Sequence, residues 1–294
     1  MLFTNQEAGC FAKDPAVVRF RGQYILYYSL RHADGRFGIG IAVSEDLDHW
    51  TPCGEIPQTQ ACESNGIAAP GAIALNGQVH LFYQTYGNGR RDAICHAVSE
   101  NGLDFCKNAE NPVFHPSDDW CCGRAIDADV CVWEGRLHLY FATRDHEMRI
   151  QQIGGAWAAL GSGFGKEAWT QLANRPLLKP ELSWEGECTE APAAIADQGR
   201  LYLFYGGSYN CTPQQIGCAV STDGINFQRT SALPFIPCGL PGAWNSSESG
   251  HPFAFRDEDG SVYLFYQGSS DGGKTWYLSR VQIVFQEGKP ILIL

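Results

Sequence analysis

The chain has 294 residues, of which 44% are hydrophobic and 18% charged, and its formal net charge at pH 7 is −11. Its 21 lysines and arginines are scattered through this acidic background, so the basic footprint that nucleic-acid binding requires is missing. No apolar run approaches the length of a membrane span, which excludes a membrane as the partner. These features favour a neutral ligand.

The N-terminal residues lack the basic region and apolar core of a secretory signal peptide. We therefore expect a cytoplasmic protein. Its twelve cysteines are expected to be reduced, because disulfide frameworks belong to short secreted chains. Cys95, Cys131 and Cys218 fall within expected strands, where a free thiol packs as a small hydrophobic side chain.

One pattern recurs five times: an opening residue, a short apolar strand, a turn and a second apolar strand. The copies open at Asp14, Ala69, Asp127, Glu190 and His251. They are spaced roughly 55 to 63 residues apart, which is typical of propellers and other repeat proteins. One such hairpin cannot bury both of its faces alone, so the copies are expected to pack against one another.

A second pattern follows three of the hairpins and ends at Trp50, Phe105 and Phe227. It predicts a third strand, a turn nucleated by Asp-Leu, Asn-Gly or Asp-Gly, and the start of a fourth strand. Four strands in each of five repeats predict an all-β fold, a five-bladed β-propeller with four-stranded antiparallel blades around a central channel. We expect a single domain over residues 1–294.

The blades are expected at about residues 14–60, 66–115, 124–180, 187–240 and 248–285. Blade three is the least regular, because a glycine-rich segment interrupts its strand pattern between Ile150 and Trp169. One chain end usually completes a blade in a closed propeller. Either residues 1–13 or residues 285–294 are therefore expected to supply a closing strand.

The inner strands of a propeller line its channel, so their first residues converge at one mouth. Here these residues are Asp14, Ala69, Asp127, Glu190 and His251. Like charges brought close together raise at least one pKa, and burial adds to that effect. Acids at strand ends can simply cap backbone groups or bind water. Three acids gathered in one concavity more often mark a functional site.

Other side chains are expected near the same mouth. Trp120, Trp184 and Trp244 each lie six or seven residues before an opening residue. They are expected either to form walls on which a sugar ring packs or to fill space between blades. Arg124 and Arg144 could hydrogen-bond sugar hydroxyls, or either could hold Asp127 ionised.

Asp129 lies two residues beyond Asp127, on the same face of the strand. It is the alternative candidate for the acid of blade three.

Asp14-Pro15, Ile-Asp-Ala-Asp-Val at 126–130, Glu-Ala-Pro at 190–192 and Ser-Gly-His at 249–251 resemble the pattern of glycoside hydrolase family 43. The resemblance extends to its five-bladed relatives in families 32, 62, 68 and 117, and by blade spacing it covers the whole chain. It implies an inverting O-glycosyl hydrolase of polysaccharides and their oligosaccharides.

By this resemblance Asp14 is the general base, Glu190 the general acid, and Asp127 the residue that tunes the pKa of the acid. His251 matches a channel histidine that in relatives holds water or a cation, often calcium. No other cofactor is expected.

Inverting hydrolysis needs a protonated carboxyl group beside the glycosidic oxygen and a carboxylate roughly 6.5–9.5 Å away, which leaves room for a water. Asp14 and Glu190 open blades across a small ring and can hold such a gap. Glu190 is expected to have the raised pKa, because Asp127 and burial favour its neutral form.

The expected substrates are oligosaccharides that end in arabinofuranosyl or xylosyl residues. The alternatives are galactosides or fructosides, a non-catalytic carbohydrate-binding propeller, and a protein-interaction scaffold. Fructan-cleaving relatives typically open with Asn-Asp-Pro, whereas this chain has Lys13-Asp14-Pro15. Ala68, Ala128 and Ala191 also depart from the residues common in family 43. These departures leave the identity of the sugar in the substrate subsite open.

Overall fold

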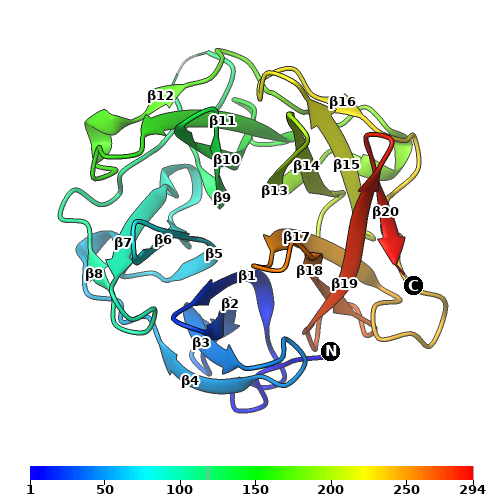
Figure 1. Ribbon diagram of the computed structural model, residues 1–294, viewed down its shortest axis with the longest axis horizontal. Helices are drawn as coiled ribbons and strands as arrows, with labels where there is room; N and C mark the ends of the chain where they lie inside the picture. The colour runs from blue at the N-terminus through cyan, green and yellow to red at the C-terminus, as the bar shows by residue number, and fades with distance from the viewer. Residues whose placement is uncertain (118, 294) are drawn as a thin grey trace.

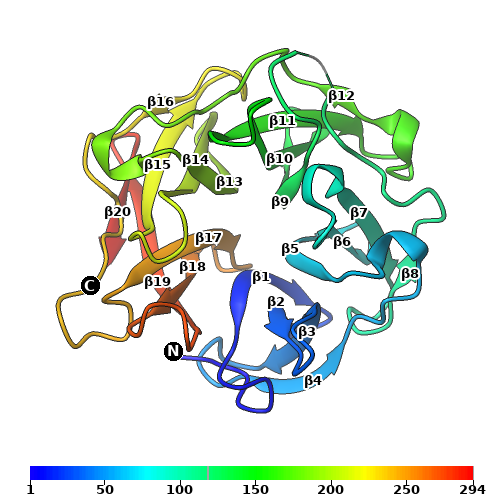
Figure 2. The same cartoon turned by 180° about the vertical axis from the view of Figure 1, so that it is seen from behind.

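The computed structural model describes residues 1–117 and 119–293. These residues form five antiparallel sheets of four strands each. The sheets stand around one axis, with β1, β5, β9, β13 and β17 nearest the centre in both views (Figure 1 and Figure 2). Each sheet is made of four consecutive strands, so the predicted five-bladed β-propeller is confirmed.

The strands follow one another blade by blade. Blade one contains β1 (Lys13–Phe20), β2 (Gln23–Arg31), β3 (Phe37–Ser44) and β4 (Thr51–Glu55). Blade two contains β5 (Ile67–Leu75), β6 (Gln78–Thr85), β7 (Ile94–Ser99) and β8 (Cys106–Lys107). Blade three contains β9 (Ile126–Trp133), β10 (Arg136–Arg144), β11 (Gln151–Ala159) and β12 (Thr170–Gln171). Blade four contains β13 (Thr189–Asp197), β14 (Arg200–Gly207), β15 (Gln215–Ser221) and β16 (Gln228–Arg229). Blade five contains β17 (Glu248–Arg256), β18 (Val262–Ser269), β19 (Tyr277–Gln286) and β20 (Lys289–Ile293).

Four short 3₁₀ helices lie in the described loops: η1 (Ala61–Glu63), η2 (Gly89–Arg91), η3 (Lys166–Ala168) and η4 (Ser183–Glu185). No helix of the described residues is long and apolar enough to cross a membrane. The same residues contain no disulfide bond.

The core lies between neighbouring blades and is rich in aromatic side chains. In blades one to four the second strand is covered on both faces, and Tyr27, Tyr83, Tyr140 and Tyr205 are almost completely buried there. Aromatic side chains suit this position because each buries a large apolar area and packs edge to face against its neighbours. Cys95, Cys131 and Cys218 are buried in β7, β9 and β15, in strands as expected.

Both chain ends close the ring at blade five (Figure 1). β20 pairs with β19 from Gln282 to Gln286. Near the start of β19, Leu278 exchanges two backbone hydrogen bonds with Phe3, each 2.8 Å long. The sequence predicted a closing strand from one end or the other, and the structure uses both. Blade five therefore extends to Ile293 instead of ending near residue 285.

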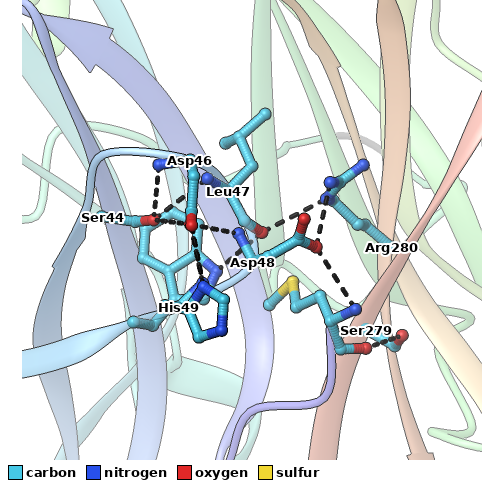
Figure 3. A network of polar contacts seen from close by, with 9 residues as sticks. Ser44, Asp46, Leu47, Asp48, His49, Ser279 and Arg280 are labelled. Carbon is cyan, nitrogen blue, oxygen red and sulfur yellow. Dashed lines mark hydrogen bonds and ion pairs between the residues drawn. The ribbon is translucent and has the colours of Figure 1, made fainter.

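Polar contacts join blades five and one at this closure (Figure 3). Asp48 lies in the turn between β3 and β4 and accepts a 3.0 Å hydrogen bond from Arg280 of β19. The same carboxylate lies 3.3 Å from the amino group of Met1. The turn is held by Asp46, whose Oδ1 accepts the backbone N–H groups of Asp48 and His49. This is the repeated turn that the sequence indicated, because Asn101, Asp223 and Asp271 accept equivalent backbone N–H groups.

A buried acid also anchors the loop that enters blade four. Glu185 is fully buried and accepts hydrogen bonds from Tyr205 at 2.6 Å and from Arg229 at 2.7 Å. It also accepts the backbone N–H groups of Glu181 and Leu182. Blade two repeats the arrangement with Glu63, Tyr83 and Lys107.

We expect Arg229→Met to destabilise the fold by about 3–5 kcal/mol, because removing one partner of a buried ion pair strands the other charge. Burial alone would raise the pKa of Glu185, but its hydrogen bonds from Arg229 and the backbone lower it below its usual value. The stabilisation is therefore present near neutral pH and is lost as the pH falls. Chemical denaturation at pH 7 and pH 4 measures both effects, with Arg91→Met, an exposed arginine, as the control. Equal unfolding free energies for the two variants at pH 7 would contradict the prediction.

Candidate active site

A cavity of about 220 Å³ opens where the inner strands begin. Asp14, Asp127, Glu190, His251, Arg124 and Arg144 all line it. Pockets for drug-sized ligands usually measure roughly 300–1,000 Å³, so this cavity suits a smaller molecule, such as one sugar unit. The structure therefore brings together the three predicted acids, the histidine and both arginines.

Each inner strand starts with an irregular step in its pairing. At this step one non-glycine residue adopts a left-handed backbone conformation, namely Asp14 (φ 52°), Ala69 (47°), Asp127 (53°), Ala191 (49°) and His251 (41°). Such a conformation costs roughly 1–2 kcal/mol per residue. It persists only where the surroundings impose it, and functional sites are common places for it.

Glu190 does not occupy the position in its strand that the repeat pattern predicted. The sequence placed it as the opening residue of blade four, but the left-handed residue there is Ala191. Glu190 pairs with Gly206 just as Lys13 pairs with Ser29 in blade one. It thus lies one residue before the strained position and still reaches the cavity. The repeat pattern chose the acid of blade four, whereas the structurally equivalent residue is the left-handed one, which precedes a proline in every blade except blade three.

Glutamines that the sequence analysis missed support two of the strained residues. Oε1 of Gln267, on β18, accepts the backbone N–H of Asp14 at 3.1 Å. Oε1 of Gln84, on β6, accepts the backbone N–H of Asp127 at 2.7 Å. Both glutamines are buried and hold their catalytic candidate from the neighbouring blade. The signal was available, because Leu-Phe-Tyr-Gln occurs in both second strands.

In blade four, Gly206 occupies the strand position that Gln84 and Gln267 occupy in blades two and five. The glutamine that supports this part of the site is Gln214, which lies just before β15. A side chain at Gly206 would place its Cβ 2.9 Å from Gln214, so the glycine makes room for the amide. Gln214 accepts the backbone N–H of His251 at 3.2 Å and donates to Oε1 of Glu190 at 2.5 Å. One fully buried amide therefore connects the blade-four acid to the blade-five histidine.

The carboxyl group of Glu190 is held on both oxygens. Gln214 donates to Oε1, and Nε2 of Gln151 donates to Oε2. Burial raises the pKa of Glu190, and the nearby Glu248 adds to that shift, while the Gln214 hydrogen bond and the charge of Lys13 oppose it. The net direction is upward, which favours the protonated form that a proton donor needs.

Asp14 and His251 form a second part of the site. Nδ1 of His251 lies 3.1 Å from Oδ1 of Asp14, and both side chains are largely buried. The histidine ring therefore fixes the orientation of this carboxylate. The contact joins the opening residues of blades one and five, which are far apart in sequence but adjacent in the ring (Figure 1).

Asp127 and Asp129 have different environments. The pKa of Asp127 is raised to about 7, mainly by burial; the charges of Glu190 and Asp14 contribute to this shift, and those of His251 and Arg124 oppose it. Asp129 lies deeper in the channel, where Oδ2 accepts the backbone N–H of Ala194 at 2.6 Å. Asp129 does not line the cavity, so Asp127 is the acid that blade three contributes to it.

The three tryptophans do not line the cavity, so their expected role as its walls is wrong. Trp184 stacks on Tyr205 with the ring centroids 6.0 Å apart, and Trp244 packs on Tyr266 at 5.5 Å. Each indole covers a strand glycine whose Cβ would collide with it: Gly154 under Trp120, Gly207 under Trp184 and Gly268 under Trp244. They fill space within the blades, which was the other expectation. The aromatic residues of the cavity are Phe37, Tyr86 and Tyr209.

The two arginines meet at one side chain. Nε of Arg144 donates to Oε1 of Gln151 at 2.8 Å, and Arg124 approaches the same oxygen at 3.5 Å. Arg124 also lies 3.5 Å from Asp92. Among the described residues, neither arginine forms an ion pair with Asp127, although the charge of Arg124 lowers the pKa of that acid.

The donor set does not match a metal centre built from protein side chains. The described residues contain no group of three or more His, Cys, Asp or Glu side chains that could hold an ion together. Nδ1 of His251 faces Asp14 instead. A calcium ion near His251 would therefore take most of its ligands from water or from backbone and amide oxygens.

The profile of the family described as "Glycosyl hydrolases family 43" matches residues 8–286. The chain belongs to glycosyl hydrolase family 43. The acids of its cavity are the groups that glycoside hydrolysis uses.

Solved structures share the family 43 fold. One is an endo-1,4-beta-xylanase from Bacteroides thetaiotaomicron, with a TM-score of 0.76 and 21% identity over 96% of this chain and 94% of that one. Another is an alpha-L-arabinofuranosidase from Lactobacillus brevis, with a TM-score of 0.73 and 17% identity over 95% and 93%. At these identities the likeness concerns the fold alone.

A curated relative is the beta-1,2-mannobiose phosphorylase of Thermoanaerobacter sp. (strain X514). It is 31% identical to this chain over 134 residues. The match covers 40% of this chain and less than half, 42%, of the length of that relative.

Proposed function

We propose that this family 43 enzyme removes terminal arabinofuranosyl or xylosyl residues from oligosaccharides with inversion of configuration. The observation that carries the proposal is the small cavity lined both by Glu190, whose pKa is raised, and by a separate carboxylate, Asp14, that His251 holds in place. One neutral carboxyl group and one oriented carboxylate are the pair that inverting hydrolysis requires.

Glu190 protonates the glycosidic oxygen as its bond to the anomeric carbon breaks. Asp14 takes a proton from a water molecule that attacks the anomeric carbon from the opposite face, so the released sugar has the inverted configuration. Gln151 and Gln214 orient the proton donor, and His251 orients the base. Asp127 lines the same cavity, and burial together with the charges of Glu190 and Asp14 raises its pKa.

Two considerations support a terminal pentosyl residue as the group removed. The cavity volume of about 220 Å³ suits one sugar unit. The names of the xylanase and the arabinofuranosidase describe enzymes that act on pentose-containing chains. A protein of this fold that only binds carbohydrate would not need a proton donor beside a separate base.

The test is release of sugar from 4-nitrophenyl glycosides of arabinofuranose, xylose, galactose and mannose, and from the matching disaccharides. We expect turnover of one pentoside, and proton NMR of the first product should show the inverted anomer. Turnover only of hexosides would overturn the pentosyl assignment. Retention of configuration would overturn the inverting mechanism. Sugar binding without turnover of any substrate would favour a carbohydrate-binding propeller.

The curated relative favours a second candidate, in which phosphate replaces water as the acceptor. The name of that relative describes a phosphorylase, and Lys13, next to Asp14 in the chain, brings positive charge to the cavity. Running the same assay with and without inorganic phosphate separates the two reactions. A sugar 1-phosphate as the main product would support phosphorolysis, and free sugar at an unchanged rate would support hydrolysis.

Gln214 provides a test of how the proton donor is positioned. Its hydrogen bond lowers the pKa of Glu190, so Gln214→Ala is expected to raise that pKa and move the basic limb of the pH–rate profile to higher pH. We also expect kcat to fall about tenfold, because Glu190 loses a fixed partner. Gln228→Ala, at an exposed position of the same blade, is the control. An unshifted basic limb would contradict this role.

A further inference from the structure

Three cations line the cavity together with the three acids: Lys13, Arg124 and Arg144. Among the described residues, none of the three forms an ion pair with a carboxylate of the cavity. Arg124 instead pairs with Asp92, which lies outside the lining. The cavity therefore holds more positive charge than its own carboxylates neutralise by contact.

The two guanidinium groups share one neutral acceptor, Oε1 of Gln151, at 2.8 Å from Arg144 and 3.5 Å from Arg124. Like charges that meet at a neutral oxygen repel one another, and an anion between them would remove the repulsion. The guanidinium of Arg144 is held in place, because it also donates to the carbonyl of Met148 at 3.0 Å and lies 5.2 Å from the ring centre of Tyr209. A fixed guanidinium is suited to bidentate binding of a carboxylate or a phosphate.

The position of this pair distinguishes two possible anions. Gln151, which accepts from both arginines, also donates to Oε2 of Glu190. A ligand held by the arginines therefore lies beside the proton donor, next to the glycosidic oxygen. In an inverting displacement the nucleophile enters from the opposite face, on the side of Asp14. The pair is thus placed to hold part of the substrate, and an attacking phosphate would have to bind elsewhere.

We propose that Arg124 and Arg144 form an oxyanion-binding subsite, and that the natural substrate carries a carboxylate or phosphate group on a sugar unit next to the scissile bond. The inference rests on the proposed function for the assignment of Glu190 as proton donor. It makes the enzyme one that acts on acidic oligosaccharides, although the protein itself has a net charge of −11.

Calorimetry on the intact protein tests the subsite independently of turnover. The probes are D-glucose, D-glucuronate, D-glucose 6-phosphate and inorganic phosphate. We expect at least one acidic sugar to bind at least about tenfold tighter than glucose to the wild type. Arg144→Met should abolish that difference, and the ratio of acidic-sugar affinity to glucose affinity, measured in the same variant, is the readout. The control is Arg136→Met, an exposed arginine of the same strand β10 that stacks on Trp157.

The two acidic sugars separate the sources of the oxyanion. Preference for glucuronate alone identifies a uronic acid, and preference for glucose 6-phosphate alone identifies a phosphorylated sugar. Equal binding of glucose and both acidic sugars would overturn the proposal. So would an acidic preference that survives in Arg144→Met, or inorganic phosphate that binds as tightly as the preferred acidic sugar.

The outcomes also separate this inference from the proposed function. Hydrolysis of neutral pentosides that depends on Asp14, without any acidic preference, would remove the oxyanion subsite and leave the hydrolase assignment. An acidic preference that is lost in Arg144→Met, in a protein that turns over no glycoside, would leave the subsite and remove the catalytic assignment.

Discussion

Asp14→Asn is expected to lower kcat at least about a hundredfold on the best substrate, with little change in KM. Asparagine has nearly the same shape and can still meet His251, but its amide cannot take a proton from the attacking water. The loss should therefore appear in the chemical step and not in substrate binding. Steady-state kinetics of the wild type and the variant on the same glycoside measure both parameters.

Asp129→Asn is the matched control for this experiment. Asp129 is buried, lies on an inner strand and has a pKa that burial raises to about 7, but it does not line the cavity. Asparagine can still accept the backbone N–H of Ala194. We expect this variant to keep most of its activity. Full activity of Asp14→Asn, or equal losses in both variants, would contradict the assignment of Asp14 as the base.

The fold could be predicted because its signal is repeated. Five copies of one hairpin pattern specify five equivalent blades, and an error in one copy leaves the other four unchanged. The closure was harder to predict, because it depends on single contacts such as the bridge between Phe3 and Leu278. Nothing in the pattern of either chain end showed that both would pair with β19.

From the sequence, only those site residues could be placed whose positions follow from the equivalence of the five blades. Openers of equivalent strands must converge, which placed Asp14, Asp127 and His251 correctly. The tryptophans lie on loops that no symmetry fixes, and whether an indole faces the cavity or a strand glycine depends on local packing. Gln214 was also beyond prediction, because it takes its place only where Gly206 leaves room.

Glu190→Gln is expected to reduce kcat/KM by about 10²–10⁴ on substrates with poor leaving groups, such as disaccharides. Substrates with good leaving groups, such as 2,4-dinitrophenyl glycosides, should lose much less, because their departure needs little protonation. A residue that serves only the structure would affect both substrate types equally. The ratio of the two losses therefore reports proton donation.

The same variant should also change the pH profile. The protonated form of Glu190 is the active one, so the wild-type rate falls as the pH rises through its raised pKa, and Glu190→Gln should remove this basic limb. Glu248→Gln is the control, because burial also raises the pKa of Glu248, yet its contacts are with Gln267 and the backbone of Cys211 outside the cavity. Glu248→Gln should keep the basic limb. If the limb persists in Glu190→Gln, a group other than Glu190 donates the proton and the assignment is wrong.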